Sequence, residues 1–282
     1  MNGPDEPACA AGPARAVSAH LHYVDRTNEP ITTDLFDESR STAPSRPYSV
    51  TIGDARRISP TSTLAAEGFT IVAKASSVDR FDGPFALDAR YAEEIVDLVG
   101  ELTGADRVLV PSPAMVRVTS PMRRAVLGAP GPAMGLHLDY SAASARNQLT
   151  THPGLAEVDL AGYSRILIYN TWRPLGPPPQ DLPLALSDKR SVGWKDTQLA
   201  RVSYGQRAIN EFEITLLCHD PGHRWWYFPD MTRDELLVFQ GWDLGPDPQP
   251  SVFHGAFVDP SCGAGAAPRS SVEMRAYALF KY

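Results

Sequence analysis

The sequence lacks the features that mark several classes of protein. It has three cysteines in 282 residues, at positions 9, 218 and 262, which predicts neither a disulfide framework nor a thiolate zinc cluster. Basic residues number 26 against 33 acidic ones, and the net charge of -7 argues against nucleic acid or an anionic membrane as the main partner. No run approaches the roughly 20 apolar residues that span a bilayer, and no signal-peptide pattern is visible, so we expect a cytoplasmic protein.

The chain does contain enough apolar sequence for a sizeable core, because 43% of its residues are hydrophobic. Residues 1–65 are rich in Pro, Ser, Thr and Arg with brief extended pieces, which predicts an N-terminal arm packed on the body. Residues 66–282 are predicted to form the core, so that the whole chain is one structural domain. The stretch GAGAAP lacks the strand, the helix and the third glycine of a dinucleotide-binding fingerprint.

One helix stands out in the sequence, over the stretch LDARYAEEIVDLVGELTG. Its apolar residues recur near helical spacing, with Asp88 as an N-cap and Gly104 as a stop. We expect this helix to pack on a sheet through the apolar face formed by Leu87, Tyr91, Ile95, Leu98, Val99 and Leu102.

From residue 105 onward the pattern favours β-structure. Short apolar runs alternate with Gly, Pro and Asp turns, as in YSRILIYNTW, DELLVFQGW and SSVEMRAYALFKY. This order is typical of a sandwich or barrel and not of alternating βαβ units. The predicted fold class is therefore mainly β (α+β), with a jelly-roll core buttressed by the helix and the N-terminal arm.

The stretch GLHLDYS carries a candidate metal site. Side chains two apart in a strand point to the same face, so His137 and Asp139 are expected to reach one point inside a barrel. His254, at the head of a later strand-like segment, is the best-placed third ligand. Two imidazoles and one carboxylate form the facial triad of non-haem Fe(II) oxygenases, which leaves positions open for a cosubstrate and O2.

A rival metal set lies in the stretch CHDPGH. The Pro-Gly pair breaks any helix that would align His219 with His223, so we predict a turn at this point.

If the cosubstrate is 2-oxoglutarate, its distal carboxylate needs a buried cation, and the fork of an arginine suits this task. The last predicted strand offers Arg269 and Ser271 side by side on one face, and Arg275 as a second candidate on the same face. We prefer Arg269 with Ser271, because they lie closer in sequence to His254.

Six blocks of the sequence resemble a known family. The matching blocks run in order from about Asp106 to the C-terminus. They resemble the iron- and 2-oxoglutarate-dependent hydroxylase/desaturase family, which includes the oxygenase component of cephamycin methoxylation and the fungal AsaB-like enzymes. The blocks are HLDYS, RILIYNTWRPL, PLALSDKRSV, RWWYFPDMTRDELLVFQGWD, FHGAFVDP and RSSVEMRA.

The resemblance implies a double-stranded β-helix, a form of jelly roll, and Fe(II), 2-oxoglutarate and O2 as cofactors. By the same resemblance, iron is bound by His137, Asp139 and His254, and 2-oxoglutarate is anchored in RSSVEMR. The block NTWRP implies that Asn170 lies at the cofactor site and that Trp172 and Arg173 line or brace the pocket.

Further residues are candidates for substrate contact. Tyr140 follows the metal pair, although strand alternation turns it away from the iron. Trp226 belongs to an aromatic run in which only alternate side chains are expected to face the site. The family more often has a Phe-Asp-His-containing segment where this chain reads PSPAMVRVTS, so the role of Arg117 is open. Asp188 and Arg190 form either an entrance gate or a solvated turn with local ion pairs.

The predicted function is oxidation of a C–H bond of a small-molecule secondary metabolite or its precursor, by hydroxylation, desaturation or cyclisation. Asp139 disfavours a halogenase, which needs that ligand position for chloride. Two alternatives are a cupin-like metalloenzyme without 2-oxoglutarate and a non-catalytic partner subunit of an oxygenase complex. A homo-oligomer is also possible.

Overall fold

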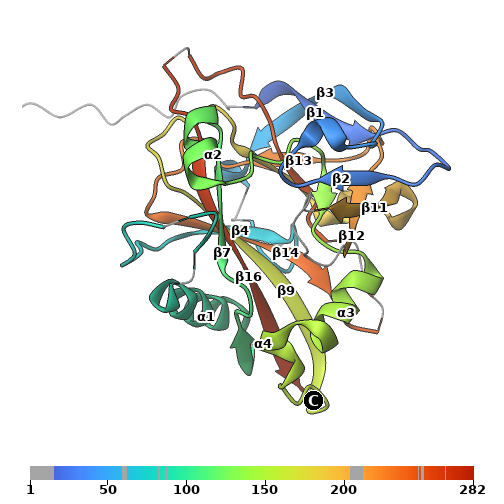
Figure 1. Ribbon diagram of the computed structural model, residues 1–282, viewed down its shortest axis with the longest axis vertical. Coiled ribbons are helices and arrows are strands. Elements are labelled where there is room, and N and C mark those ends of the chain that lie inside the picture. The colour runs from blue at the N-terminus through green and yellow to red at the C-terminus, as the bar shows by residue number, and fades with distance from the viewer. Residues whose placement is uncertain are drawn as a thin grey trace, which may run out of the picture.

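The computed structural model describes residues 16–58, 62–81, 83–86, 88–203, 212–246, 248, 251–263 and 265–282 (Figure 1). Leu87 and the first fifteen residues of the predicted arm lie outside the described residues. None of the helices in the described part of the chain is both long and apolar enough to cross a lipid bilayer.

Two sheets form the body. The nine-stranded sheet runs in the order β1-β3-β13-β10-β15-β8-β12-β11-β2. Its strands are β1 (Val17–Val24), β3 (Ser45–Asp54), β13 (Trp225–Tyr227), β10 (Leu184–Ser187), β15 (His254–Ala256), β8 (His137–Leu138), β12 (Phe212–Leu217), β11 (Thr197–Ser203) and β2 (Thr32–Asp34).

The seven-stranded sheet runs in the order β4-β14-β9-β16-β7-β5, with β6 paired to β16. Its strands are β4 (Phe69–Ala73), β14 (Glu235–Asp243), β9 (Tyr163–Pro174), β16 (Ser270–Lys281), β7 (Ala114–Val118), β5 (Phe85–Ala86) and β6 (Arg107–Leu109). The predicted mainly-β architecture is confirmed.

Alternation along the long strands β9 and β16 separates an inner layer from an outer one. Ile168 and Tyr277 point between the sheets and pack with Leu138 of the facing sheet. Leu167 and Met274, of the opposite parity, belong to an outer cluster beneath α1 (Ala89–Thr103). The period of two residues in a strand therefore decides which β9 and β16 side chains reach the interior.

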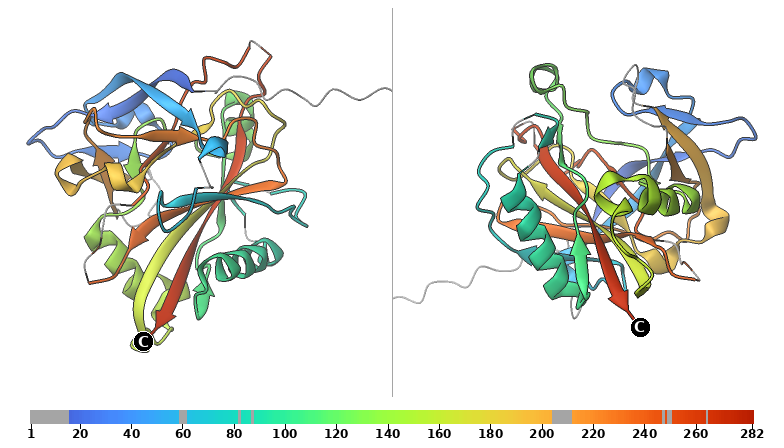
Figure 2. Two further views of the ribbon diagram at one scale, coloured as in Figure 1. Left: turned by 180° about the vertical axis from the view of Figure 1, so that it is seen from behind. Right: turned by 60° about the horizontal axis from the view of Figure 1, so that its bottom comes forward.

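The helix α1 matches its prediction. Asp88 caps it by accepting hydrogen bonds from the backbone of Arg90 and Tyr91, and Gly104 ends it in the left-handed conformation at φ 65°. Its apolar face lies against the outer face of the seven-stranded sheet (Figure 2). Leu102 is an exception, since it is 37% exposed in the last turn of the helix.

Three short helices and three strands were not predicted. The helices are α2 (Pro121–Leu127), α3 (Ala142–Thr151) and α4 (Pro153–Ala156), and the strands are β2, β5 and β11. The helix α2 spans seven residues, which is shorter than the window of roughly 11 residues in which helical periodicity is recognised, and it buries none of them. Four 3-10 turns complete the elements: η1 (Glu38–Arg40), η2 (Ala55–Arg57), η3 (Lys189–Ser191) and η4 (Trp194–Asp196).

The N-terminal strands are integrated into the nine-stranded sheet. β1 and β3 pair antiparallel from Val17 opposite Ile52 to Val24 opposite Ser45, and β3 pairs in parallel with β13. The assignment of residues 1–65 as an N-terminal arm packed on the core stays a prediction.

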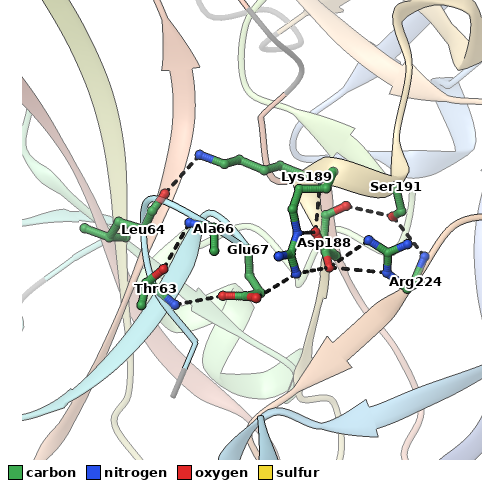
Figure 3. A network of polar contacts seen from close by, with 9 residues as sticks. Thr63, Leu64, Ala66, Glu67, Asp188, Lys189, Ser191 and Arg224 are labelled. Atoms are coloured by element: carbon green, nitrogen blue, oxygen red, sulfur yellow. Dashed lines mark hydrogen bonds and ion pairs between the residues drawn. The ribbon is translucent and has the colours of Figure 1, made fainter. Parts of the chain in front are cut away.

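A buried carboxylate lies at the start of η3. Asp188 is 1% exposed and accepts hydrogen bonds from the side chains of Arg190, at 2.9 and 2.7 Å, and of Arg224, at 3.1 Å. Arg190 also binds Glu67 at 2.6 Å, so the cluster joins three segments far apart in sequence (Figure 3). Burial of Asp188 differs from the expected solvated turn, because two guanidinium groups replace its water.

Candidate metal centre and the adjoining pocket

The two histidines of the predicted triad lie on neighbouring strands. β8 and β15 pair at His137 and His254, and the two ring centroids are 4.5 Å apart. Each Nδ1 lies near a backbone carbonyl, that of Gly135 at 2.8 Å and that of Val252 at 3.3 Å. Because a carbonyl only accepts, each Nδ1 carries the proton and each Nε2 keeps a free lone pair.

Asp139 completes the cluster, just after the end of β8. Its two carboxylate oxygens lie 3.8 Å from Nε2 of His137 and 3.9 Å from Nε2 of His254. One ligand atom from each of the three residues falls within 4.8 Å of the others. This spacing and this donor set fit a divalent metal of the Fe(II) type.

The electrostatics of the cluster also favour a metal. Burial and the neighbouring His137 lower the pKa of His254 to about 4, which keeps its imidazole neutral. Burial alone would raise the pKa of Asp139, but Arg275 and the two histidines outweigh burial and hold it below the ordinary value. His254 is thus a neutral imidazole and Asp139 a carboxylate, the forms that bind metal.

The opposite sheet holds the carboxylate in place. Arg275 of β16 donates to one oxygen of Asp139 and Asn170 of β9 donates to the other, each at 2.6 Å. Arg275 and Asn170 are cross-strand neighbours. A Cβ at Gly241 would lie 3.2 Å from Oδ1 of Asn170, so the glycine leaves room for the amide. Two predicted cofactor-binding residues therefore contact a ligand of the candidate metal centre.

Arg269 lies in a different environment. It is 2% exposed, and its guanidinium donates to Ser271 Oγ at 3.2 Å and to the carbonyl of Leu182 at 3.0 Å. The guanidinium carbon lies 5.0 Å from the ring centroid of Trp172. Within the described residues no carboxylate forms an ion pair with Arg269, and burial lowers its pKa to about 10. Buried charges in proteins are usually paired, so a buried guanidinium without an ion pair in the described part of the chain is unusual.

A cavity of about 360 Å³ adjoins the cluster. His137, Asp139 and Arg275 lie on its wall, together with Arg117. Arg117 donates to Glu273 at 3.1 Å and to the carbonyl of Gly131 at 3.0 Å. The cavity connects the candidate metal centre with a space large enough for a small organic molecule.

Four predicted substrate residues are not on the wall of this cavity. Trp172 instead lines a small separate space beside Asn170 and His254. Tyr140 is buried, with its hydroxyl 3.2 Å from that of Tyr277 and its ring beneath Arg275. Trp226 packs beside the apolar cluster of β10 and β14. Arg173 has the parity opposite to Trp172, so it points outward and donates to two backbone carbonyls at 2.7 Å. Alternation along β9 explains why Arg173 faces away from the cavity.

The stretch CHDPGH forms a turn, as predicted. Asp220 accepts from the backbone of Gly222 at 2.7 Å, and the ring of His219 stacks on Tyr48 with centroids 4.0 Å apart. Among the described residues, only His137, Asp139 and His254 form a group with metal-binding spacing.

The structure also reveals residues that the sequence did not single out. Glu273 is the acidic partner of Arg117, and its inward parity on β16 was visible in the sequence. Arg124 of α2 lies on the cavity wall, and no signal in the sequence pointed to it because α2 was not predicted.

Comparisons with known proteins give consistent matches. A sequence family described as an oxidoreductase/YMDC permease-like domain matches residues 21–279. The Fe(II)/2-oxoglutarate-dependent dioxygenase nvfI of Aspergillus novofumigatus is 29% identical over 234 residues, which cover 81% of this chain and 82% of the relative. The hydroxylase/desaturase efuI of Hormonema carpetanum is 30% identical over 249 residues, with coverage of 80% and 81%.

The hydroxylase/desaturase asaB of Aspergillus flavus is 34% identical over 131 residues, which cover 42% of this chain and 57% of the relative. A solved structure of the iron and alpha-ketoglutarate-dependent endoperoxidase NvfI superposes with a TM-score of 0.77 at 24% identity, covering 95% of this chain and 99% of that chain. The overall fold is therefore shared along almost the whole chain, and the predicted jelly roll is confirmed.

Proposed function

Since the chain belongs to the family of Fe(II)- and 2-oxoglutarate-dependent dioxygenases, we propose that His137, Asp139 and His254 are its iron ligands. The resemblance to AsaB-like enzymes is confirmed, and the one to the cephamycin methoxylation oxygenase stays a prediction. When bound, Fe(II) couples the oxidative decarboxylation of 2-oxoglutarate by O2 to the oxidation of a C–H bond.

One observation carries the assignment of the ligands. Every outer atom of the three side chains already has a partner that orients it: a backbone carbonyl for each Nδ1, and Arg275 and Asn170 for the carboxylate. Such outer hydrogen bonds fix the tautomer and rotamer of a metal ligand. The residues are arranged to hold a metal even before it binds.

Arg269 and Ser271 are proposed to bind the distal carboxylate of 2-oxoglutarate. The guanidinium is held by Leu182 and Ser271 and is stacked near Trp172, which excludes water from it. Arg275 is the weaker candidate, because its Nη2 already contacts Asp139. A buried, unpaired Arg269 also argues against a cupin-like enzyme without 2-oxoglutarate, which has no carboxylate to place there.

The substrate is proposed to occupy the cavity of about 360 Å³, where His137 and Asp139 face it. Among the predicted substrate residues, Arg117 lies on the wall of this cavity, and we propose that it contacts the substrate. Its guanidinium is held by Glu273. We propose a small natural product or its precursor, oxidised by hydroxylation, desaturation or cyclisation. The cytoplasmic location and a homo-oligomer or partner subunit stay predictions.

The test is anaerobic mixing of the protein with Fe(II) and 2-oxoglutarate. We expect the visible charge-transfer band of the chelate, and succinate once O2 is admitted. Asp139→Ala should abolish both, whereas Asp159→Ala, an exposed aspartate, should retain both. A protein that forms neither band nor succinate would leave the cupin-like enzyme and the non-catalytic subunit as the better readings.

A further inference from the structure

The cavity beside the candidate metal centre contains a cation that the proposed chemistry does not use. Arg124 of α2 is half-buried on the cavity wall, while its neighbour Arg123 is exposed and not on the wall. Within the described residues the guanidinium of Arg124 has neither a hydrogen-bond acceptor nor an acidic partner. It is therefore available to a molecule in the cavity.

The backbone beneath this guanidinium is a glycine. A Cβ at Gly131 would lie only 3.3 Å from Cζ and Nη1 of Arg124, so the absence of a side chain lets the guanidinium rest against the chain. The carbonyl of the same glycine accepts a hydrogen bond from Arg117 at 3.0 Å. Gly131 thus places two arginines side by side on the cavity wall.

Only one of these two charges is balanced. Arg117 pairs with Glu273 at 3.1 Å. The two carboxylates on the cavity wall are already engaged: Asp139 by Arg275 and Asn170, and Asp34 by two backbone amides and Ser203. Arg124 remains as a positive charge without compensation.

The remainder of the wall is largely apolar. It includes Leu35, Phe36, Val202, Phe212, Ile214 and Leu216. A cavity of about 360 Å³ with apolar walls and a few placed polar groups is typical of a site for a small organic ligand. Its occupant must therefore offer apolar surface to most of the wall and a polar or charged group to Arg124.

We propose that Arg124 determines specificity by binding an acidic group of an otherwise apolar substrate. The inference rests on the proposed function for calling the ligand a substrate, but the binding itself needs no metal. The chain as a whole carries a net charge of -7 and repels anions at long range, so the attraction must come from a local cation. An apolar organic acid satisfies both the wall and the guanidinium.

The test uses metal-free protein and two fluorescent probes. 8-Anilinonaphthalene-1-sulfonate has an apolar ring system and an anionic group, and N-phenyl-1-naphthylamine has the same rings without the sulfonate. Arg124→Gln should weaken binding of the anionic probe roughly tenfold, the size expected for one charge-assisted hydrogen bond, and leave the neutral probe within about twofold. Arg123→Gln, the matched control, should change neither. Equal affinity of all proteins for the anionic probe, or equal loss of both probes in Arg124→Gln, would overturn the proposal.

The chelate band keeps this inference separate from the proposed function. Arg124→Gln should form the band with Fe(II) and 2-oxoglutarate as the unmodified protein does. Loss of the band in this variant alone would place Arg124 at the cosubstrate and overturn the inference. If neither protein forms the band while the probe result holds, the acid-binding cavity stands and the dioxygenase assignment fails.

Discussion

Replacing Arg269 by methionine should separate cosubstrate binding from folding. The methionine keeps apolar contact with Trp172 but removes a guanidinium that is 2% exposed and has no acidic partner in the described part of the chain. We therefore expect a protein that folds as well as the original and no longer responds to 2-oxoglutarate.

The magnitude follows from the environment of Arg269. Burial lowers its pKa from 12.5 to about 10, so below pH 10 the charged form costs the folded state about 3 kcal/mol, at about 1.4 kcal/mol for each unit. The cost falls as the pH rises from 10 towards 12.5, where the charge is lost from the folded state first. Methionine removes this cost but also removes the bonds to Ser271 and Leu182, worth about 1 kcal/mol each. At pH 7.5 the variant should be within about 1–2 kcal/mol of the unmodified protein.

Addition of 2-oxoglutarate should distinguish the thermal stability of the unmodified protein from that of Arg269→Met. A ligand at 100 times its Kd stabilises the folded state by about 2.7 kcal/mol. For a chain of this size that raises Tm by roughly 5–10 °C. The unmodified protein with Mn(II) should show this shift, and Arg269→Met should show none.

The assay is thermal unfolding with Mn(II), with and without 2-oxoglutarate. Arg123→Met is a suitable control, because Arg123 is exposed and lies off the cavity wall. It should retain the full shift. The reasoning is wrong if Arg269→Met still shifts with 2-oxoglutarate, or if it is several kcal/mol less stable without it.

Three further predictions concern other parts of the molecule. Asn170→Ala removes one of the two donors to Asp139 and should weaken metal affinity by about 10- to 100-fold in a chelator competition; affinity equal to that of the unmodified protein would contradict the bracing role. Asp188→Asn should lower the free energy of unfolding by about 2–3 kcal/mol in urea, because the half-exposed Arg190 and Arg224 lose only part of their partner, whereas Asp159→Asn should change little. Gly104→Ala should lower the free energy of unfolding by about 1 kcal/mol, because the φ of Gly104 is 65° and an added Cβ meets nothing within 4 Å, which leaves backbone strain as the cost. Gly100→Ala inside the same helix should not destabilise. Equal effects of the two substitutions would rule out backbone strain as the cause.

Much of the candidate centre could be predicted from local spacing. His137 and Asp139 are two residues apart, and β16 presents Ser271 and Arg275 on one face with Arg269 just before it, because the period of a strand is a local property. Spacing along one strand does not say what lies on the facing sheet. The contact of Arg275 with Asp139 depends on how the two sheets pack, so sequence could name the residue but not its partner.

The errors have local causes as well. Arg173 follows Trp172 in a matching block, yet neighbours in a strand face opposite layers, and only Trp172 reaches the interior. The helix containing Arg124 has only seven residues, too few for its apolar spacing to stand out, and its Ser120 cap is a weak signal on its own. Surface elements of this kind are positioned by the loops around them.

The chemistry and the cavity wall come from different stretches of the chain. The candidate ligands and their supports lie at 137–139, 170, 254 and 275, whereas much of the apolar wall comes from residues 33–45 and from Val202, Phe212, Ile214 and Leu216, and the cationic part from Arg117 and Arg124. Of these segments, β12 pairs with β8 beside His137, whereas residues 33–45 do not pair with β8, so changes in residues 33–45 should leave the ligand geometry intact. A lineage can acquire new substrates while keeping one reaction, and a directed-evolution library confined to residues 33–45 should yield altered selectivity without loss of catalysis.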